Sequence, residues 1–159
     1  MTAEADKMRR SVSNAVEKFA HEPGPLLEIL HAVQNDLGCV PPDAVPLLAA
    51  ALNLTRAEVY GVVSFYHHFR EQVPGRYVVQ LCRAEACQSM NSRALEIFAR
   101  QRLGCDFGET SADGRVTLEA VYCLGNCACA PSMMVNGELY GRVTPERVAE
   151  LANEWGVPA

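Results

Sequence analysis

The feature that most constrains this chain is a set of four cysteines arranged as two short pairs. Cys82 and Cys87 have four residues between them in LCRAEAC, and Cys123 and Cys127 have three residues between them in YCLGNC. Each pair follows a run of residues typical of a β-strand. Four cysteines that converge have few uses in proteins, since they bind zinc, hold an iron–sulfur cluster or form disulfides. We expect the two pairs to converge on one such site.

Length and charge exclude several classes of protein. A chain of 159 residues can bury a sizeable core, so it does not need a metal merely to fold. Its formal net charge of −5 comes from interspersed acidic and basic residues, which disfavours nucleic acid or an anionic membrane as a partner. No apolar run approaches the ~20 residues that span a bilayer, and the start lacks the apolar region of a secretory signal. We therefore expect a cytoplasmic protein, in which closely spaced cysteines favour metal or redox chemistry over structural disulfides.

Residues 1–73 are predicted to form a helical N-terminal region. Apolar residues repeat with a period near 3.6 over 8–19 and again over 26–37, as on the buried face of an amphipathic helix. Helix ends are marked by local signals that favour caps and breaks. They are Gly38 as a C-cap, Pro41 and Pro42 as breaks, Asp43 as an N-cap for a helix reaching Leu52, and Thr55 with Glu58 as a capping box.

Residues 74–159 are predicted to form an α+β domain of thioredoxin type. The expected elements are a strand at Tyr77–Leu81, a helix capped by Asn91, a loop over 104–114, a strand at Val116–Tyr122, a hairpin turning at Asn136–Gly137, and a helix from Thr144–Pro145 to Trp155. Their order is β, α, β, β, β, α, with few strands and with helices to pack against them. Both cysteine pairs therefore follow strands of the same domain.

The cysteine spacing alone supports an iron–sulfur cluster and a zinc site equally, because zinc knuckles tolerate two to four residues between the cysteines. The surroundings favour the cluster, since Gly125–Asn126 supplies a turn whose amides can point at sulfur. Zinc knuckles usually have the two-residue spacing, which neither pair has. The sequence supports thiol–disulfide catalysis even less than zinc binding, because that activity would need a C-x-x-C pair at a helix N-terminus.

A longer set of motifs resembles a known family. GCVPPDAV, EVYGVVSFYHHF, LCRAEAC, CLGNCACAP and NGELYGRVTPERV are similar to the thioredoxin-like [2Fe-2S] subunit of NADH dehydrogenases, the 24-kDa type of respiratory complex I. Counterparts occur in bidirectional hydrogenases and soluble NAD-dependent formate dehydrogenases. The resemblance runs from about residue 25 to 152 and implies a helical bundle followed by a thioredoxin-like [2Fe-2S] ferredoxin domain. The short form is most like the gamma subunit of a soluble formate dehydrogenase or the equivalent hydrogenase diaphorase subunit.

The resemblance also implies a role for each cysteine of the two pairs. The four ligands of one [2Fe-2S] cluster fall on Cys82, Cys87, Cys123 and Cys127, and the cluster exchanges electrons with the FMN of a partner subunit that binds NAD(H). This chain contains no dinucleotide fingerprint or phosphate loop, so FMN and NAD are expected in the partner only. We expect an electron-transfer subunit without catalytic residues or turnover of its own. Further iron–sulfur subunits, or subunits with molybdenum, tungsten or nickel, are compatible with such a complex.

Three alternatives stay open at this point. The parent complex could be an NADH–quinone oxidoreductase or an NAD-linked hydrogenase in place of a formate dehydrogenase. The chain could also be a free-standing thioredoxin-like ferredoxin, although a shuttle would not need so long a helical extension. A four-cysteine zinc module would share the fold and the thiols but would be colourless.

Other residues that could bind metal have simpler interpretations. Cys39, Cys105 and Cys129 are expected to be small, buried residues, because free cysteine packs as a modest hydrophobe. His67 and His68 are adjacent on an expected helix, where they would point about 100° apart and make a poor metal site.

Two further features have more than one interpretation. The aromatic residues Phe65, Tyr66 and Phe69 are expected in the helix core, with a docking face as a compatible use. Arg83 is either solvated or, beside an anionic cluster, favours the reduced state through its positive charge.

Overall fold

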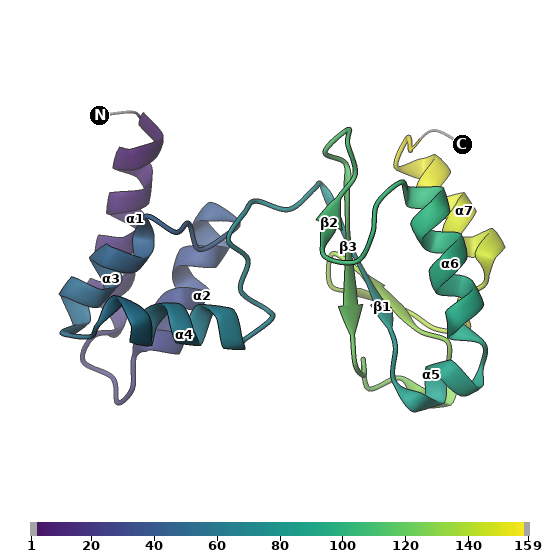
Figure 1. Ribbon diagram of the computed structural model, residues 1–159, viewed down its shortest axis with the longest axis horizontal. Coiled ribbons are helices and arrows are strands. Elements are labelled where there is room, and N and C mark those ends of the chain that lie inside the picture. Colours follow the sequence, from purple (N-terminus) through teal and green to yellow (C-terminus); the bar gives the residue numbers. More distant parts are fainter. Residues whose placement is uncertain (1–2, 158–159) are drawn as a thin grey trace. The chain divides into compact units, whose positions relative to one another are not determined.

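The computed structural model describes residues 3–157, which form two compact units that divide between Val73 and Pro74. The N-terminal unit consists of four helices (Figure 1). They are α1 (Ala3–Phe19), α2 (Leu26–Leu37), α3 (Ala44–Leu52) and α4 (Arg56–Phe65). Every one of these helices contributes side chains to a single apolar core, including the fully buried Ile29, Leu30, Leu48 and Val59. The periodicity expected over 8–19 and 26–37 therefore corresponds to the buried faces of α1 and α2.

Most helix ends in this unit follow the local sequence signals. Gly38 ends α2 with a left-handed backbone (φ 84°), and its N–H donates to the carbonyl of Gln34. Thr55 and Glu58 form the predicted capping box, because each side chain bonds the backbone N–H of the other residue. The N-cap role predicted for Asp43 is wrong. Its backbone is already helical (φ −69°, ψ −15°), so its carboxylate makes no cap hydrogen bond to α3.

The segment after α4 is not helical, which corrects the prediction for its histidines and aromatics. The helix ends at Phe65, so His67 and His68 lie in the connection that follows it. The buried side chain of Gln34 holds this connection, since its Nε2 donates to the carbonyl of His68 (2.8 Å) and its Oε1 accepts from the N–H of Arg70 (2.8 Å). Phe69 enters the core, as expected.

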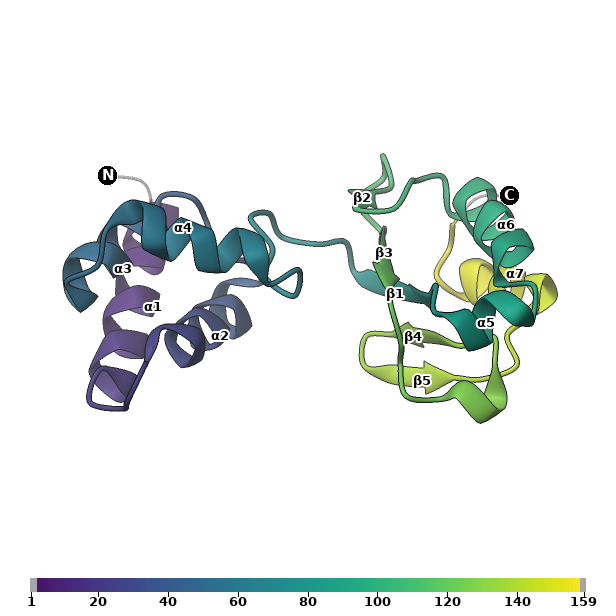
Figure 2. The same ribbon diagram turned by 60° about the horizontal axis from the view of Figure 1, so that its bottom comes forward.

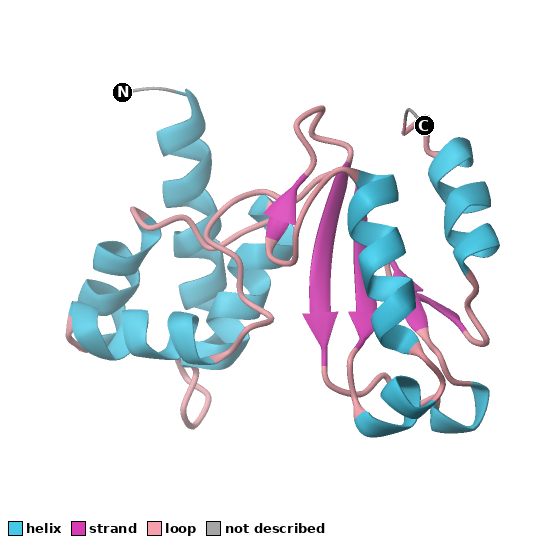
Figure 3. Cartoon of the chain, turned by 45° about the vertical axis from the view of Figure 1, so that its right-hand side comes forward, coloured by secondary structure: helices cyan, strands magenta, loops and turns pink. Residues whose placement is uncertain are grey.

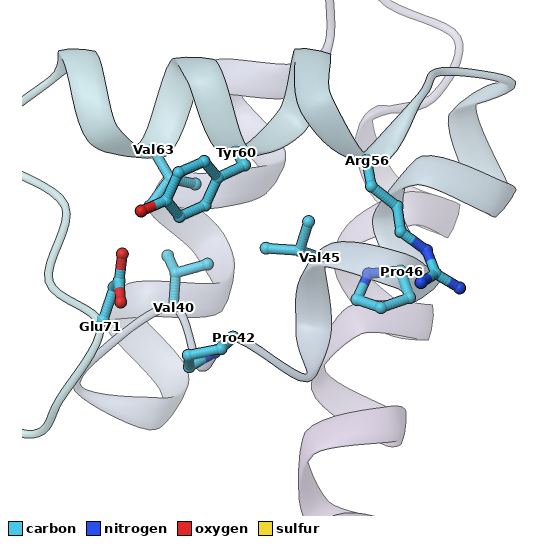
Figure 4. A pocket seen from close by; sticks show the side chains of 8 residues that line it. All are labelled: Val40, Pro42, Val45, Pro46, Arg56, Tyr60, Val63 and Glu71. Carbon is cyan, nitrogen blue, oxygen red and sulfur yellow. The ribbon is translucent and has the colours of Figure 1, made fainter.

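Part of the surface of the helical unit is apolar. Phe65 is 72% exposed and Tyr66 is 44% exposed, so these two aromatics lie outside the core in which they were expected. Close by in sequence, Tyr60 helps to line a pocket of about 260 Å³ (Figure 4). The other lining residues are Val40, Pro42, Val45, Pro46, Arg56, Val63 and Glu71.

The C-terminal unit is a five-stranded mixed sheet with helices packed on it, which confirms the thioredoxin-like α+β class. Its elements are β1 (Tyr77–Cys82), α5 (Glu85–Ser89), α6 (Ser92–Leu103), β2 (Glu109–Thr110), β3 (Val116–Val121), β4 (Met133–Val135), β5 (Glu138–Tyr140) and α7 (Pro145–Glu154). The strand order is β2-β3-β1-β4-β5, with β1 and β3 parallel and the other neighbours antiparallel. Figures 1 and 3 show α6 and α7 on the same face of the sheet.

The core of this unit lies between the sheet and these two helices. Leu118 and Met133 of the central strands are fully buried there, together with Ala99 of α6 and Ala152 of α7. The β4–β5 hairpin lies beside β1 (Figure 2) and turns at Asn136–Gly137, as predicted. Both turn residues have positive φ angles (48° and 89°), which Asn and Gly tolerate best.

Three local features differ from the sequence expectation. The short helix α5 lies between the first two cysteines, and the short strand β2 pairs with β3 inside the segment expected as a loop. A helix of five residues and a strand of two are too short to give a periodic pattern. Asn91 does precede α6, but it adopts a left-handed backbone (φ 62°) and makes no side-chain cap.

No helix among residues 3–157 is long and apolar enough to cross a membrane.

Candidate metal centre

The two cysteine pairs lie at the same edge of the sheet because they follow two neighbouring parallel strands. Cys82 is the last residue of β1 and pairs in register with Val121, the last residue of β3. The N–H of Arg83 donates to the carbonyl of Val121 (2.7 Å), which extends this pairing beyond the strand ends. Cys123 follows two residues later. At this end of the sheet, α5 lies beside the turn that follows β3 (Figures 1 and 3).

The first pair is buried. Cys82 is 4% exposed and Cys87, inside α5, is 2% exposed. Gln88, the residue after Cys87, stabilises the connection between them, because its side-chain amide donates to the carbonyl of Arg83 (2.6 Å). Burial is the main cause that raises the pKa of the Cys87 thiol, and the neighbouring Cys82 raises it further. These two thiols therefore share one apolar niche, which also contains Ala130.

The second pair is exposed and is shaped by a tight turn. The Sγ atoms of Cys123 and Cys127 are 3.7 Å apart. Cys123 has a positive φ of 138°, which is rare for a side-chain-bearing residue, and Gly125 has a φ of 76°. The N–H of Gly125 donates to the Sγ of Cys123 (3.3 Å), so one amide of the turn expected at Gly125–Asn126 does point at sulfur. A short 3-10 helix, η1 (Cys127–Cys129), follows this turn.

Thiols of the two pairs lie close enough to influence one another. The pKa of Cys127 is raised mainly by its hydrogen bond with Cys123, and the charge of Cys82 contributes to the same effect. Cys127 in turn adds to the raised pKa of Cys87. Thiolates gathered in this way repel one another, and a bound cation relieves that repulsion.

The thiols are grouped two by two. All seven cysteines are free of disulfides, and within the described residues no three His, Cys, Asp or Glu side chains are grouped around a single metal position. A [2Fe-2S] cluster takes four cysteine ligands, two for each of its irons. Two thiol pairs close enough for their charges to interact, one with an amide donor to sulfur, fit that donor set.

Ser132 makes hydrogen bonds near both pairs. The spacing of the cysteines in the sequence does not predict this role. Its carbonyl accepts from the N–H of Cys82 (3.1 Å), while its hydroxyl lies 3.3 Å from the carbonyl oxygens of both Asn126 and Cys129. Ser132 stands just before β4, the strand that pairs antiparallel with β1. That sheet pairing brings its carbonyl to Cys82, whereas its hydroxyl reaches the turn from nearby in sequence.

The remaining cysteines are separate from the pairs or peripheral to them. Cys39 and Cys105 are buried, and burial is the main cause that raises the pKa of each thiol. Cys129 is only partly buried, so the fully buried position expected for it is not what the structure has.

Arg83 is neither freely solvated nor unpaired. Its Nε lies 3.1 Å from a carboxylate oxygen of Glu96, and its guanidinium stacks over the ring of Phe107 at 4.9 Å. Glu96 is almost entirely buried. The positive charge inside the first cysteine pair is therefore accompanied by a buried negative one.

Comparison with known proteins finds one family model and relatives that are all subunits of oxidoreductase complexes. The family model described as thioredoxin-like [2Fe-2S] ferredoxin matches residues 12–156. The chain is 32% identical over 146 residues to the HndA subunit of the NADP-reducing hydrogenase of Solidesulfovibrio fructosivorans, covering 92% of this chain and 85% of that one. It is 33% identical over 143 residues to a subunit of the NADH-quinone oxidoreductase of Pseudomonas aeruginosa, covering 90% and 86%. The corresponding protein of Escherichia coli K12 is 29% identical over 147 residues, covering 92% and 89%.

A solved structure shares the fold. The crystal structure of an NAD⁺-reducing [NiFe]-hydrogenase in the H₂-reduced state matches with a TM-score of 0.68 and 23% identity, covering 82% of this chain. The match spans only 22% of the hydrogenase chain, and at this identity it supports the fold alone.

Proposed function

Because the chain belongs to the thioredoxin-like [2Fe-2S] ferredoxin family, we propose that it is the electron-transfer subunit of an NAD-linked oxidoreductase complex. Its one [2Fe-2S] cluster would be held by Cys82, Cys87, Cys123 and Cys127. The observation that carries this ligand set is the convergence of two thiol pairs at the ends of the parallel strands β1 and β3. When bound, the cluster supplies one-electron exchange.

The two pairs would have different tasks. Cys82 and Cys87 are buried on β1 and α5, so they anchor one side of the site in the domain. Cys123 and Cys127 are exposed, so they form the side that faces a redox partner. The N–H of Gly125 stabilises negative charge on the Sγ of Cys123, which is the kind of contact that tunes a reduction potential.

The proposed redox partner is a flavoprotein subunit that binds NAD(H) and carries FMN. The named relatives are subunits of an NADP-reducing hydrogenase and of NADH-quinone oxidoreductases, which supports a partner of this class. The resemblance of this sequence to the gamma subunit of soluble NAD-dependent formate dehydrogenases supports a cytoplasmic formate dehydrogenase as the parent complex. A hydrogenase or an NADH-quinone oxidoreductase is the second candidate, favoured by the names of those relatives. In each case substrate turnover would take place on other subunits.

The cluster itself is tested by spectroscopy of the purified chain. We expect a coloured protein with two irons per chain and an electron paramagnetic resonance (EPR) signal after reduction with dithionite. A colourless, EPR-silent protein with stoichiometric zinc would refute the cluster and support a zinc-stabilised module.

The partner is tested by co-expression with candidate flavoprotein subunits. We expect a stable complex on size exclusion, in which NADH reduces the cluster of this chain. A loaded chain that never associates with a flavoprotein would instead be a free-standing ferredoxin.

A further inference from the structure

One buried residue, Ser132, makes hydrogen bonds both to Cys82 and to the turn that carries Cys127. It is 2% exposed and lies between Pro131 and the first residue of β4. Its main chain bonds Cys82 of the first pair and its side chain bonds the backbone around Cys127, so the two contributions can be separated by mutation.

The main chain of Ser132 bonds the buried pair. Its carbonyl accepts from the N–H of Cys82 (3.1 Å), which continues the β1–β4 pairing to the end of β1. This contact belongs to the backbone, so a change of side chain leaves its donor and acceptor in place.

The side chain of Ser132 bonds the turn that carries the exposed pair. Its Oγ lies 3.3 Å from the carbonyl oxygen of Asn126 and 3.3 Å from that of Cys129. These carbonyls flank Cys127, and a single hydroxyl proton serves both. The hydroxyl therefore connects the backbone on either side of Cys127 to the residue whose carbonyl bonds Cys82.

We infer that Ser132 is a positioning residue that sets the distance and orientation of Cys127 relative to the buried pair. This inference rests on the proposed cluster function. Contacts behind the ligands of a metal site orient those ligands, and their removal commonly costs about 10–100-fold in metal affinity. Because the potential and the electronic structure of a cluster depend on ligand geometry and hydrogen bonds, a shift of Cys127 alters both.

The chain contains a matched control. Ser92 is also 2% exposed and lies in the same unit, but its hydroxyl has no hydrogen-bond partner among the described residues. Ser92→Ala thus removes a buried hydroxyl without disturbing the cysteine turn. At position 132, Thr and Val have nearly the same shape and differ in the hydroxyl, so this pair separates the hydrogen bonds from packing.

The experiment compares the purified, cluster-loaded wild type with Ser132→Ala, Ser132→Thr, Ser132→Val and Ser92→Ala. The readouts are the midpoint potential, the EPR g-values after dithionite, and the rate of cluster loss to a chelator. We expect Ser132→Ala and Ser132→Val to change the g-values and the potential and to lose the cluster about tenfold faster. Ser132→Thr and Ser92→Ala should stay close to wild type.

Two results would overturn the inference while leaving the cluster assignment intact. One is identical spectra and potentials for Ser132→Thr and Ser132→Val. The other is a Ser132→Ala protein that melts at a lower temperature but keeps the wild-type g-values, which is the behaviour of an ordinary buried serine. A wild-type chain that binds no iron would instead refute the proposed function, and it is detected before any variant is made.

Discussion

Gly141 lies so close to Cys129 that a Cβ atom at position 141 would be 2.7 Å from the Cβ of Cys129. The same atom would be 2.8 Å from Nδ2 of Asn126. The next residue, Arg142, donates its backbone N–H to the carbonyl of Cys129 (2.6 Å). The chain after β5 therefore packs directly against the turn that carries Cys127, and only glycine leaves room for that approach.

Gly141→Ala should destabilise the C-terminal unit. The three atoms nearest the added Cβ are Cβ and O of Cys129 and Nδ2 of Asn126, all in the turn around Cys127, so relief of the clash displaces that turn. We expect a loss of about 1–3 kcal/mol in the free energy of unfolding, together with a lower iron content. Thermal unfolding and iron analysis measure these effects. Gly61→Ala is the control, since no atom lies within 4 Å of its added Cβ and it should be neutral or stabilising. Equal behaviour of the two variants would contradict the packing argument.

The proposed ligand set is tested by single replacements of cysteine by alanine. Loss of Cys82, Cys87, Cys123 or Cys127 should abolish the cluster or severely change its absorption and EPR spectra. Cys129→Ala should leave both spectra largely intact, because Cys129 lies two residues beyond Cys127 and belongs to neither pair. Damage from Cys129→Ala as severe as that from the other four would overturn the assignment.

Arg83 and Glu96 should shift the cluster potential in opposite directions. A positive charge near the site stabilises the reduced, more negative cluster, so Arg83→Ala should lower the midpoint potential. Glu96 places a carboxylate 3.1 Å from Nε of Arg83, and its replacement by Gln should raise the potential. Redox titration followed by EPR measures both values. Shifts of the same sign in the two variants would show that packing, and not charge, controls the effect.

Gln34 should be essential to the stability of the helical unit. It is buried, and its amide satisfies both the carbonyl of His68 and the N–H of Arg70. Gln34→Leu keeps the volume but leaves these backbone groups without that partner, at an expected cost of about 2 kcal/mol in the free energy of unfolding. Chemical denaturation measures the change. Asn35→Leu, at the exposed neighbouring position, is the control and should cost far less.

The contacts that were predicted correctly residue by residue join near neighbours in sequence. The capping box of Thr55 and Glu58 and the turn at Asn136–Gly137 each lie within a few residues, so their chemistry is visible in the sequence. Ser132 escaped prediction, because its contact with Cys82 joins residues 50 positions apart and depends on the β1–β4 pairing. The same holds for Gln34, which reaches 36 residues along the chain to Arg70. Contacts made only by tertiary packing leave no local pattern.

The capping box should make the stability of the helical unit depend on pH. Hydrogen bonds from the backbone N–H and hydroxyl of Thr55 lower the pKa of Glu58 in the folded state. A carboxyl group whose pKa is lower when folded contributes stability that is fully present above its unfolded pKa of about 4.3. That stability is lost as the pH falls through the lower, folded pKa.

Glu58→Gln tests this pH dependence, because glutamine keeps an acceptor oxygen but cannot titrate. Urea denaturation of the wild type and of this variant is compared between about pH 6 and pH 3, a range that spans the ordinary glutamate pKa. The wild type should lose its stability advantage over the variant as the pH falls. Curves that stay parallel throughout would show that the Thr55–Glu58 contact does not depend on the charge of Glu58.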